Sequence, residues 1–399
     1  MGIFTNALSQ NIIIGQNVRY ENNTMFNMFN NCVNLNSPIS IPSGITNMVY
    51  TFYNCVSFNQ PVKAPSTVTN LYRTFANCRS LNQPVEITGA VTNMDYAFVS
   101  CTNFNQPVSI PSTVKTLLGT FYACSSFNQP VSIPNTVTSL SATFQSCSNF
   151  NQPVTIPDTV TLASYALSGC TNFNQPIVIP NKVNNAAYML NGCKNFNSTV
   201  TFLNSNTVVL SFFNGCSNFN QPVNLPSTTH YTSTFEGCTN FNQPVSIPST
   251  ATYTPNMFRN CTSFNQTVKL SSKWITAENM FRNCANLNSV IAFPNTTSTY
   301  PLLNNAFRGC TNITDIVINA VLRNNAVGFV AEKNNARMLN IYCSTSALSY
   351  LNKTSASGSI VNAAITWSNE ATNYCMYNTA YNIYIYYNPS KHNWGGYTW

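Results

Sequence analysis

Cysteine is the residue type with the clearest chemical potential in this chain, because it recurs at a nearly fixed spacing. A deprotonated thiol can bind a metal, enter a disulfide or attack an electrophile. Of the 15 cysteines, 13 follow one another at 23 residues, apart from one interval of 22 and a last interval of 26: Cys32, Cys55, Cys78, Cys101, Cys124, Cys147, Cys170, Cys193, Cys216, Cys238, Cys261, Cys284 and Cys310. One cysteine at the same register of every repeat indicates a column of small buried side chains. We therefore predict reduced core thiols.

Other residue arrangements that support chemistry are missing from the sequence. No C-x-x-C pair occurs, and His230 and His392 are far apart, so we predict no metal site and no cofactor. The nine acidic residues are scattered and do not pair at the repeat spacing, apart from the region of Glu236 and Glu278. No nucleophile motif or phosphate-binding glycine loop is present. We predict no catalytic residues and no enzymatic activity.

The repeat predicts one short strand and one turn per unit. In Cys124 to Ser146, CSSFNQPVSIPNTVTSLSATFQS, Val131 and Ile133 alternate as the inward residues of a strand do. A phenylalanine three residues before each cysteine is replaced only by Leu167 and Leu190. This spacing favours one helical or 3-10 turn that points both side chains inward. Because a single unit cannot bury its apolar face, the units must stack, and their strands must form a parallel sheet.

The segment Phe-Asn-Gln-Pro has a structural interpretation in each unit. Phenylalanine, or leucine at 35, 81 and 287, fills the core, and proline begins the strand where its missing N–H does no harm. We expect the asparagine to satisfy backbone groups left unpaired at a tight corner. It recurs at Asn36, Asn59, Asn82, Asn105, Asn128, Asn151, Asn174, Asn197, Asn220, Asn242, Asn265 and Asn288.

These patterns resemble a known class of repeat. A period of 20–29 residues with apolar strand positions is typical of leucine-rich repeats. VSIPSTVKTLLGTFYAC (Val108 to Cys124) resembles the BspA-like, Treponema-type repeats, and SFNQPV (Ser57 to Val62) is similar to repeats of mycoplasma surface lipoproteins. The resemblance covers about residues 25–318. It implies a leucine-rich-repeat solenoid of about 13 coils, with a parallel sheet on one face, short helical or 3-10 turns on the other, and a surface adhesin or interaction protein of unspecified ligand.

Composition excludes two classes of partner. Charged residues make up 7% of the chain, and the net charge of +8 is spread without a Lys/Arg run, so we expect no nucleic-acid binding. No apolar stretch approaches the roughly 20 residues that span a bilayer, so we expect no membrane insertion. The start, MGIFTNALSQNIIIGQNVRY, has no basic residue before Arg19 and does not resemble a signal peptide. We expect synthesis in a cytoplasm without such a leader.

Two columns of side chains are candidate ligand-binding residues. Two residues before the cysteine, the last repeats carry Arg259, Arg282 and Arg308, whose charges need solvent or an anion. Five residues before the cysteine lie Tyr50, Tyr96, Tyr165 and Tyr188, with Arg73 in the same column. Tyrosine favours interfaces and sugar stacking. Ordinary packing is the alternative for both columns. The middle residues of the strands are mostly small and uncharged, which suits glycan hydroxyls, a flat protein neighbour or solvent.

The two ends depart from the repeat, and we predict three parts: residues 1–24 as an N-terminal cap, 25–318 as the solenoid, and 319–399 as an aromatic C-terminal cap or anchoring module. Alternation over 381–386 predicts a strand there. Exposed aromatic rings favour burial, so this module is expected to cap the solenoid, dock or oligomerise. Its candidate interface residues are Tyr384, Tyr386, Tyr387, Trp394, Tyr397 and Trp399.

The functional hypothesis from the sequence is a non-enzymatic binding or structural protein. The favoured interpretation is a surface or tail component of a phage or viral particle, which docks to virion proteins through the C-terminal module and adheres to a host glycan or protein. The alternatives are a bacterial surface adhesin and an intracellular protein-interaction scaffold.

Overall fold

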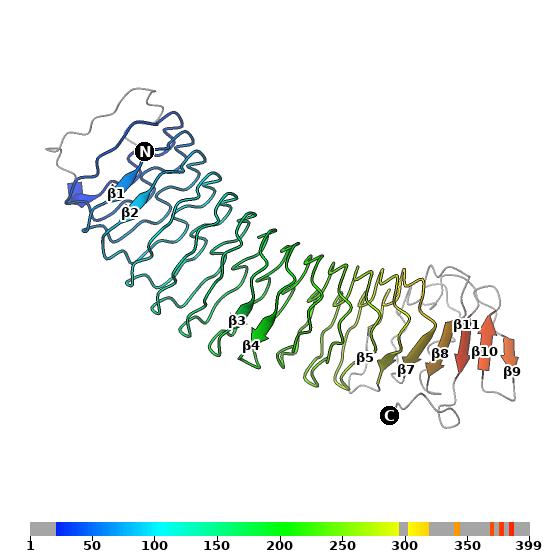
Figure 1. Ribbon diagram of the computed structural model, residues 1–399. Helices are drawn as coiled ribbons and strands as arrows, with labels where there is room; N and C mark the ends of the chain where they lie inside the picture. Colours follow the sequence, from blue (N-terminus) through cyan, green and yellow to red (C-terminus); the bar gives the residue numbers. More distant parts are fainter. Residues whose placement is uncertain are drawn as a thin grey trace. The chain divides into compact units, whose positions relative to one another are not determined.

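The computed structural model of the chain describes residues 21–294 and 302–318, together with short strands at 339–343, 368–370, 375–378 and 383–386. The chain divides into two compact units, Met1–Asn204 and Ser205–Trp399. In each unit, stacked coils of about 23 residues repeat one backbone path (Figure 1). The solenoid predicted from the repeat is therefore present.

The residues before each cysteine form consecutive hydrogen-bonded turns. Before Cys55, the N–H of Thr51 donates to the oxygen of Met48 (3.1 Å), and the N–H of Cys55 donates to the oxygen of Phe52 (3.1 Å). The third residue of each of these turns, Tyr50 or Asn54, has a positive φ. A helical or 3-10 turn needs negative φ throughout, so the predicted helical turns are replaced by β-turns of the type II kind. Within the described ranges, the only 3-10 segment is η1, Glu21–Asn23.

Positive φ recurs at the same two positions of the repeat, five residues and one residue before the cysteine. Five before, it occurs at Asn27, Tyr50, Arg73, Tyr96, Gly119, Ala142, Tyr165, Tyr188, Ser211, Ser233, Asn256, Asn279 and Asn305. One before, it occurs at Asn31, Asn54, Asn77, Ser100, Ala123, Ser146, Gly169, Gly192, Gly215, Gly237, Asn260, Asn283 and Gly309. This conformation costs most residues about 1–2 kcal/mol, so the surrounding contacts must impose it where the residue is not glycine.

A ladder of hydrogen bonds between coils imposes it. Within each unit, alternate N–H groups of a turn segment donate to the next coil, while the intervening N–H groups close the turns of their own coil. In the coil that ends at Cys32, the donors and their acceptor carbonyls are Met25 to Asn47 (2.9 Å), Asn27 to Val49 (3.1 Å), Phe29 to Thr51 (2.9 Å) and Asn31 to Tyr53 (2.8 Å). We call this arrangement the turn ladder. All its bonds point toward the following coil.

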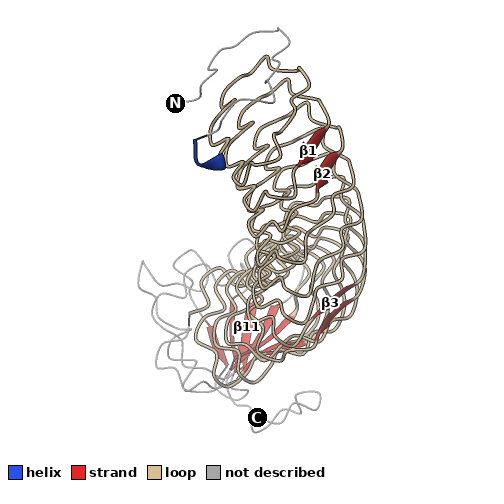
Figure 2. Cartoon of the chain, turned by 90° about the vertical axis from the view of Figure 1, so that its left-hand side faces the viewer, coloured by secondary structure: helices blue, strands red, loops and turns tan. Residues whose placement is uncertain are grey.

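The strand side is less regular than the sequence predicts. In the first unit, β1 (Val62–Ala64) pairs in parallel with β2 (Val85–Ile87), and β3 (Ile177–Ile179) pairs in parallel with β4 (Val200–Phe202). The equivalent residues at 108–110 and 131–133 form no strand. Figure 2 shows these short strands in red within a chain that is mostly loop and turn. The parallel sheet expected along one face is thus present as separate pairs.

The second unit contains a longer sheet. Its strands are β5 (Val268–Lys269), β6 (Ile291–Phe293), β7 (Asp315–Ile318), β8 (Leu339–Cys343), β9 (Ser368–Glu370), β10 (Cys375–Asn378) and β11 (Ile383–Tyr386). The order is β5-β6-β7-β8-β11-β10-β9, parallel from β5 to β11 and antiparallel beyond (Figure 1). The strand predicted at 381–386 is confirmed as β11. Because β8 pairs with β7, the edge of the last repeat strand is covered.

The predicted chain ends lie largely outside the described residues. These include residues 1–20 and most of 319–399, apart from the four strands just named. The proposed boundaries at 24/25 and 318/319 therefore stay a prediction.

Stacked phenylalanines fill the core between the strand and turn sides. Phe121 and Phe144, each three residues before a cysteine, have ring centroids 5.7 Å apart at an interplanar angle of 3°. Phe127, from the Phe-Asn-Gln-Pro segment, stacks on Phe150 at 6.1 Å and on Phe121 at 4.5 Å. All four rings are buried. The two phenylalanine columns therefore form one continuous apolar stack within the unit.

The cysteine column lies beside these rings, as predicted. Eleven of the thiols donate to the carbonyl of the residue three before the previous cysteine, as from Cys124 to Phe98 and from Cys147 to Phe121, both at 2.9 Å. Burial raises the pKa of these thiols far above the ordinary value, and it raises the pKa of Cys310 to about 12. The thirteen cysteines of the repeat are buried and none of them is in a disulfide, so the column lies in the core as predicted. Their reduced state stays a prediction.

The asparagine of Phe-Asn-Gln-Pro also has its predicted role. The Oδ1 atom of Asn128 accepts the backbone N–H of Asn151 in the next coil (2.9 Å) and the Nε2 of Gln152 (3.2 Å). The same contact recurs at most of the coil steps, so each amide satisfies the backbone of the following corner.

Candidate functional site

The two predicted columns of candidate residues lie on the turn ladder. The residues five before the cysteine themselves have positive φ. The residues two before it directly follow the buried phenylalanine of each coil. Successive rings of that column in the second unit are 5.5 Å apart: Phe235 to Phe258, Phe258 to Phe281, and Phe281 to Phe307. Equivalent surface side chains of successive coils are therefore spaced by about the distance between coils, which the rings place near 5.5 Å.

The first tyrosines belong to a larger aromatic cluster in the first unit. The ring of Tyr50 meets Tyr72 edge-on at 5.6 Å, Tyr53 at 5.4 Å and Phe26 at 6.2 Å between centroids. Phe26 is 53% exposed. We define the aromatic cluster as Phe26, Tyr50, Tyr53, Tyr72, Arg73 and Tyr96. Three of its aromatic residues were missed because they lie outside the register of Tyr50: Phe26 and Tyr72 are six residues before their cysteines, and Tyr53 is two residues before Cys55.

Arg73 links this cluster through its guanidinium group. Its Cζ lies 4.8 Å from the ring centroid of Tyr96 and 5.6 Å from that of Tyr72, and its Nε donates to the hydroxyl of Tyr72 at 3.2 Å. The ring of Tyr96 lies over Gly119 of the next coil, where a Cβ would be 2.4 Å from Tyr96 Cε1. Gly119 therefore leaves room for the ring, and the cluster ends there.

Tyr165 and Tyr188 form a separate pair in the same unit. Their rings stack at 4.6 Å with an interplanar angle of 2°, and Tyr165 is 38% exposed. Burial, followed by the neighbouring Tyr188, raises the pKa of Tyr165. Leu162, three residues before Tyr165, is 41% exposed. The structure thus separates the four predicted tyrosines into a cluster and a pair, because Gly119 and Ala142 interrupt the column.

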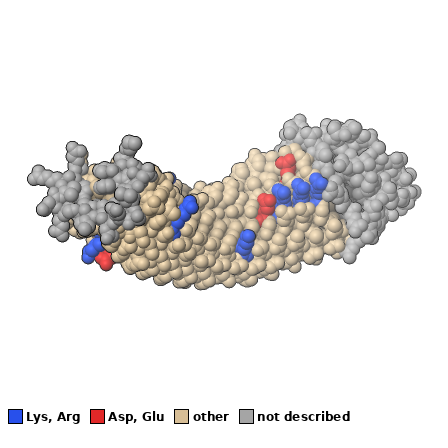
Figure 3. All heavy atoms as spheres, turned by 90° about the horizontal axis from the view of Figure 1, so that it is seen from above, with Lys and Arg blue, Asp and Glu red and all other residues tan. Residues whose placement is uncertain are grey.

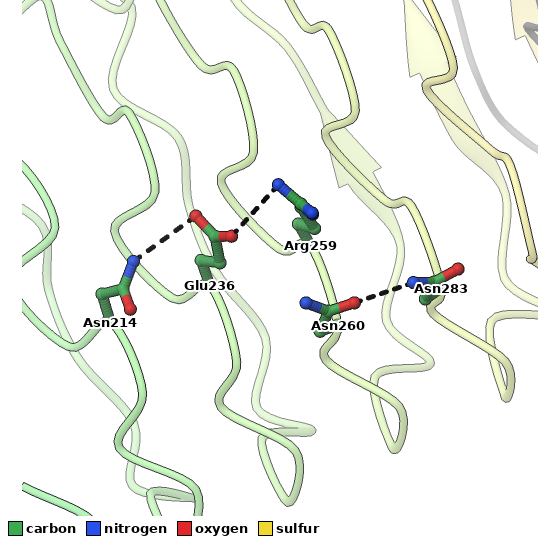
Figure 4. A network of polar contacts seen from close by, with 5 residues as sticks. All are labelled: Asn214, Glu236, Arg259, Asn260 and Asn283. Carbon is green, nitrogen blue, oxygen red and sulfur yellow. Dashed lines mark hydrogen bonds and ion pairs between the residues drawn. The ribbon is translucent and has the colours of Figure 1, made fainter. Parts of the chain in front are cut away.

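The predicted arginine column has an acidic first member in the second unit. Glu236 occupies the position of Arg259 one coil earlier, and Oε1 of Glu236 lies 3.5 Å from Nη1 of Arg259. Asn214, at the same position one coil before that, donates to Glu236 Oε2 at 3.4 Å (Figure 4). Sequence analysis grouped Glu236 with Glu278, although its place two residues before Cys238 puts it in the arginine column.

The charge of Arg282 in this column is not balanced among the described residues. Arg282 has no ion-pair partner there, and the Nε atoms of Arg259 and Arg282 are buried without a hydrogen bond. Guanidinium groups at the coil interval repel by roughly 1 kcal/mol in water and more near a protein surface. Figure 3 shows the row of basic side chains beginning beside an acidic one. We call Arg259, Arg282 and Arg308 the arginine row.

Amide groups border the arginine row. Nδ2 of Asn283 donates to Oδ1 of Asn260 at 2.9 Å, one residue along the chain from Arg282 and Arg259 respectively (Figure 4). Nδ2 of Asn304 donates to Glu278 Oε1 at 2.8 Å on a neighbouring part of the turns. The row is therefore surrounded by groups that donate and accept hydrogen bonds.

The strand side holds a shallow groove that sequence analysis missed. It has a volume of about 400 Å³ and is lined by Pro61, Pro65 and Pro84, among others. Lys63 and Glu86 form an ion pair of 3.3 Å at its side, with both side chains mostly exposed. A pair this exposed contributes little to stability.

The remaining candidates lie in the C-terminal part. The backbones of Tyr384 and Tyr386 belong to β11 and pair with Asn340 and Tyr342 of β8. Tyr387, Trp394, Tyr397 and Trp399 lie outside the described residues. Over the part of the chain that the structure describes, no group of His, Cys, Asp or Glu could hold a metal ion, and no helix could span a membrane.

Comparison with known families identifies the repeat. A family described as "Mycoplasma protein of unknown function, DUF285" matches residues 2–109, 64–155, 115–224, 204–293 and 254–318, which together cover most of the chain. The chain belongs to the DUF285 family. The predicted likeness to mycoplasma repeat proteins is thereby confirmed.

Two solved structures share the fold of this DUF285 chain. A leucine-rich repeat protein from Bacteroides ovatus has 21% identity and a TM-score of 0.54, over 73% of this chain and 81% of that one. A leucine rich cell surface protein from Faecalibacterium prausnitzii has 22% identity and a TM-score of 0.52, over 81% of this chain and 86% of that one. The leucine-rich-repeat fold is confirmed. No curated protein matches the chain.

Proposed function

We propose that this DUF285 chain is a non-enzymatic binding protein displayed at a bacterial surface, with the turn side of its solenoid as the binding surface. One of the two similar structures is described as a cell surface protein, and neither is described as viral. This favours the bacterial surface over the virion among the hypotheses drawn from the sequence. The C-terminal module, 319–399, is the proposed site of attachment to other proteins of the surface.

The turn ladder is the observation that carries this proposal. It fixes the backbone beneath the aromatic cluster and the arginine row with hydrogen bonds of 2.7–3.2 Å between coils. Tyrosine and arginine are the residues most enriched at the centres of binding surfaces, and a fixed backbone lowers the entropy lost on binding. The strand side offers mainly small, uncharged side chains and lacks such clusters among the described residues.

Surface display is tested by protease treatment of intact cells of the source bacterium. We expect peptides of residues 25–318 to be released from intact cells while a cytoplasmic marker protein stays uncut. Protection on intact cells together with recovery in phage particles would instead support the virion hypothesis. Protection together with one stoichiometric partner in the lysate would support the intracellular scaffold.

The binding surface is tested with the purified chain and fixed host cells. We expect Tyr50→Ala, which removes the centre of the aromatic cluster, to weaken adhesion about tenfold or more, as loss of an aromatic anchor does. Tyr253→Ala is the matched control, because Tyr253 is also half-buried and stacks on a single ring, that of His230, at 4.4 Å. Equal adhesion by both variants would exclude the aromatic cluster as a binding surface.

A further inference from the structure

We propose that the arginine row binds an anionic glycan, through sulfate or carboxylate groups spaced along a polysaccharide. This inference rests on the proposed function and names the ligand class of one part of the turn side. It follows from the charges of the row, the groups that border it and the limits of its length.

The middle arginine of the row, Arg282, carries charge that the described part of the chain leaves uncompensated. Glu236 pairs with Arg259, whereas Arg282 has no ion-pair partner in the described part of the chain. The Nε atoms of Arg259 and Arg282 are buried without a hydrogen bond, so the outer guanidinium nitrogens are the donors left to meet a ligand. Guanidinium groups bind sulfate and carboxylate through paired N–H donors.

The backbone holds these donors at a regular interval. The phenylalanine that precedes each arginine is buried, and successive rings are 5.5 Å apart. Turn-ladder bonds at 2.7–2.8 Å join Asn260 to the carbonyl of Arg282 and Asn283 to the carbonyl of Arg308. A ligand with repeated negative charges matches a row of this kind better than a single small anion does, because one anion contacts only part of it.

The surroundings favour a polysaccharide over a nucleic acid. The amides of Asn260 and Asn283 lie beside the row and suit sugar hydroxyls. Glu236 lies at one end of the row and Glu278 lies four residues before Arg282 in the sequence, so the positive stretch is short and bordered by carboxylates. Nucleic-acid binding also draws its affinity from many phosphate contacts, and three arginines supply few.

The test measures binding of the full chain to immobilised heparin, which carries sulfate and carboxylate, and to hyaluronan, which carries carboxylate only. Dextran and duplex DNA are the comparison surfaces. We expect binding to heparin, to hyaluronan or to both, none to dextran, and loss at about 1 M NaCl, where the Debye length is about 3 Å. Binding to heparin without binding to hyaluronan would assign sulfate as the recognised group.

Two pairs of variants assign the binding to the row. Arg282→Ala should raise the Kd for the bound glycan about tenfold, as loss of a charge-assisted contact does, whereas Lys269→Ala, with the same loss of charge at an exposed strand position, should not change it. Glu236→Gln should lower the Kd several-fold by removing the opposing carboxylate. Asp158→Asn, at an exposed position in the first unit, is its control.

A third variant separates recognition from misfolding. Arg282→Lys keeps the charge and loses the paired donors, so its Kd should lie between those of the natural chain and Arg282→Ala. Equal Kd values for Arg282→Ala and Lys269→Ala, binding to DNA as tight as to heparin, or no binding to either glycan would overturn the proposal. In those cases the proposed function stands if surface display and the effect of Tyr50→Ala are found, and it fails if the chain is protected on intact cells.

Discussion

The turn side and the strand side of the coils are built by different means. On the turn side, hydrogen bonds join the coils at alternate residues along the whole segment before the cysteine. On the strand side, only some coils pair, as β1 does with β2 and β3 with β4, while residues 131–133 form no strand. The buried thiols and the phenylalanine three residues before each cysteine belong to the turn side. The regularity of the solenoid thus comes from its turns more than from its sheet.

Alkaline pH should cause the largest loss of stability, and the loss should come from the buried thiols of the turn side. Each thiol has an ordinary pKa of about 8.5, and burial raises it in the folded chain, to about 12 for Cys310. The folded state therefore keeps its full stability, as far as the thiols are concerned, below about pH 8.5. Above that pH the thiols ionise more readily in the unfolded chain, and the folded state loses stability as the pH rises toward the raised pKa. Each thiol contributes at most about 1.4 kcal/mol per pH unit, and several thiols act in each unit.

Urea unfolding at pH 7.5, 8.5 and 9.5 measures this loss. In the variant Cys147→Ala, the free energy of unfolding should fall less between pH 8.5 and 9.5 than in the natural chain. The difference should be about 1 kcal/mol, the contribution of one thiol over one pH unit. A stability that stays constant up to pH 9.5 would contradict the burial of the thiols.

Removal of a core ring should show the next largest effect. Phe127→Ala deletes a fully buried ring that stacks on Phe121 and Phe150, and we expect it to lower the free energy of unfolding by about 3–5 kcal/mol. Val131→Ala, on the strand side of the same coil, removes a half-buried side chain and should cost about 1 kcal/mol. Thermal and urea unfolding followed by circular dichroism would compare the two variants. Equal losses in the free energy of unfolding would show that the strand side contributes as much to stability as the core rings of the turn side.

Loss of one corner amide should have a smaller effect. Asn128→Ala removes the acceptor for the N–H of Asn151 and for Gln152, so it should destabilise the chain by about 1–2 kcal/mol. Ser132→Ala changes an exposed residue on the strand side and should alter the free energy of unfolding by no more than about 0.5 kcal/mol. Hydrogen exchange of the Asn151 amide would locate the effect, because this N–H should exchange faster only in Asn128→Ala.

The smallest expected effect tests the positive φ positions. Ala123 has φ of 60°, so Ala123→Gly relieves a strained backbone and should stabilise the chain by about 0.5–1 kcal/mol. Ala97→Gly, at a buried position without positive φ, should destabilise it by about 1 kcal/mol. Opposite shifts in melting temperature would confirm the backbone conformation of the turns, and shifts of the same sign would contradict it.

Much of the fold could be predicted because each coil repeats the same contacts. The period located the coils, and the conserved register of Cys, Phe and Asn within this chain predicted the thiol column, the core rings and the corner amides. The turn conformation could not be predicted in the same way. At the position of Tyr50, the repeat also places Arg73, Gly119 and Ala142, so no residue type marks the positive φ that the ladder imposes there.

The candidate site was predicted in part for a related reason. Columns of one residue type stood out, such as the three arginines and the four tyrosines. Contacts between neighbouring columns did not, so Phe26, Tyr53 and Tyr72 were missed. Glu236 was overlooked as the first member of the arginine column because its type differs while its register is the same.

The turn ladder also bears on how such a protein changes over generations. Because neighbouring coils of one unit donate and accept at equivalent atoms, the bonds are the same from one coil to the next within that unit. Removal or duplication of one 23-residue segment would join two matching surfaces and restore the same contacts. Gain or loss of one repeat can therefore lengthen or shorten the turn side in whole coils, because the new junction makes the same contacts as the old one.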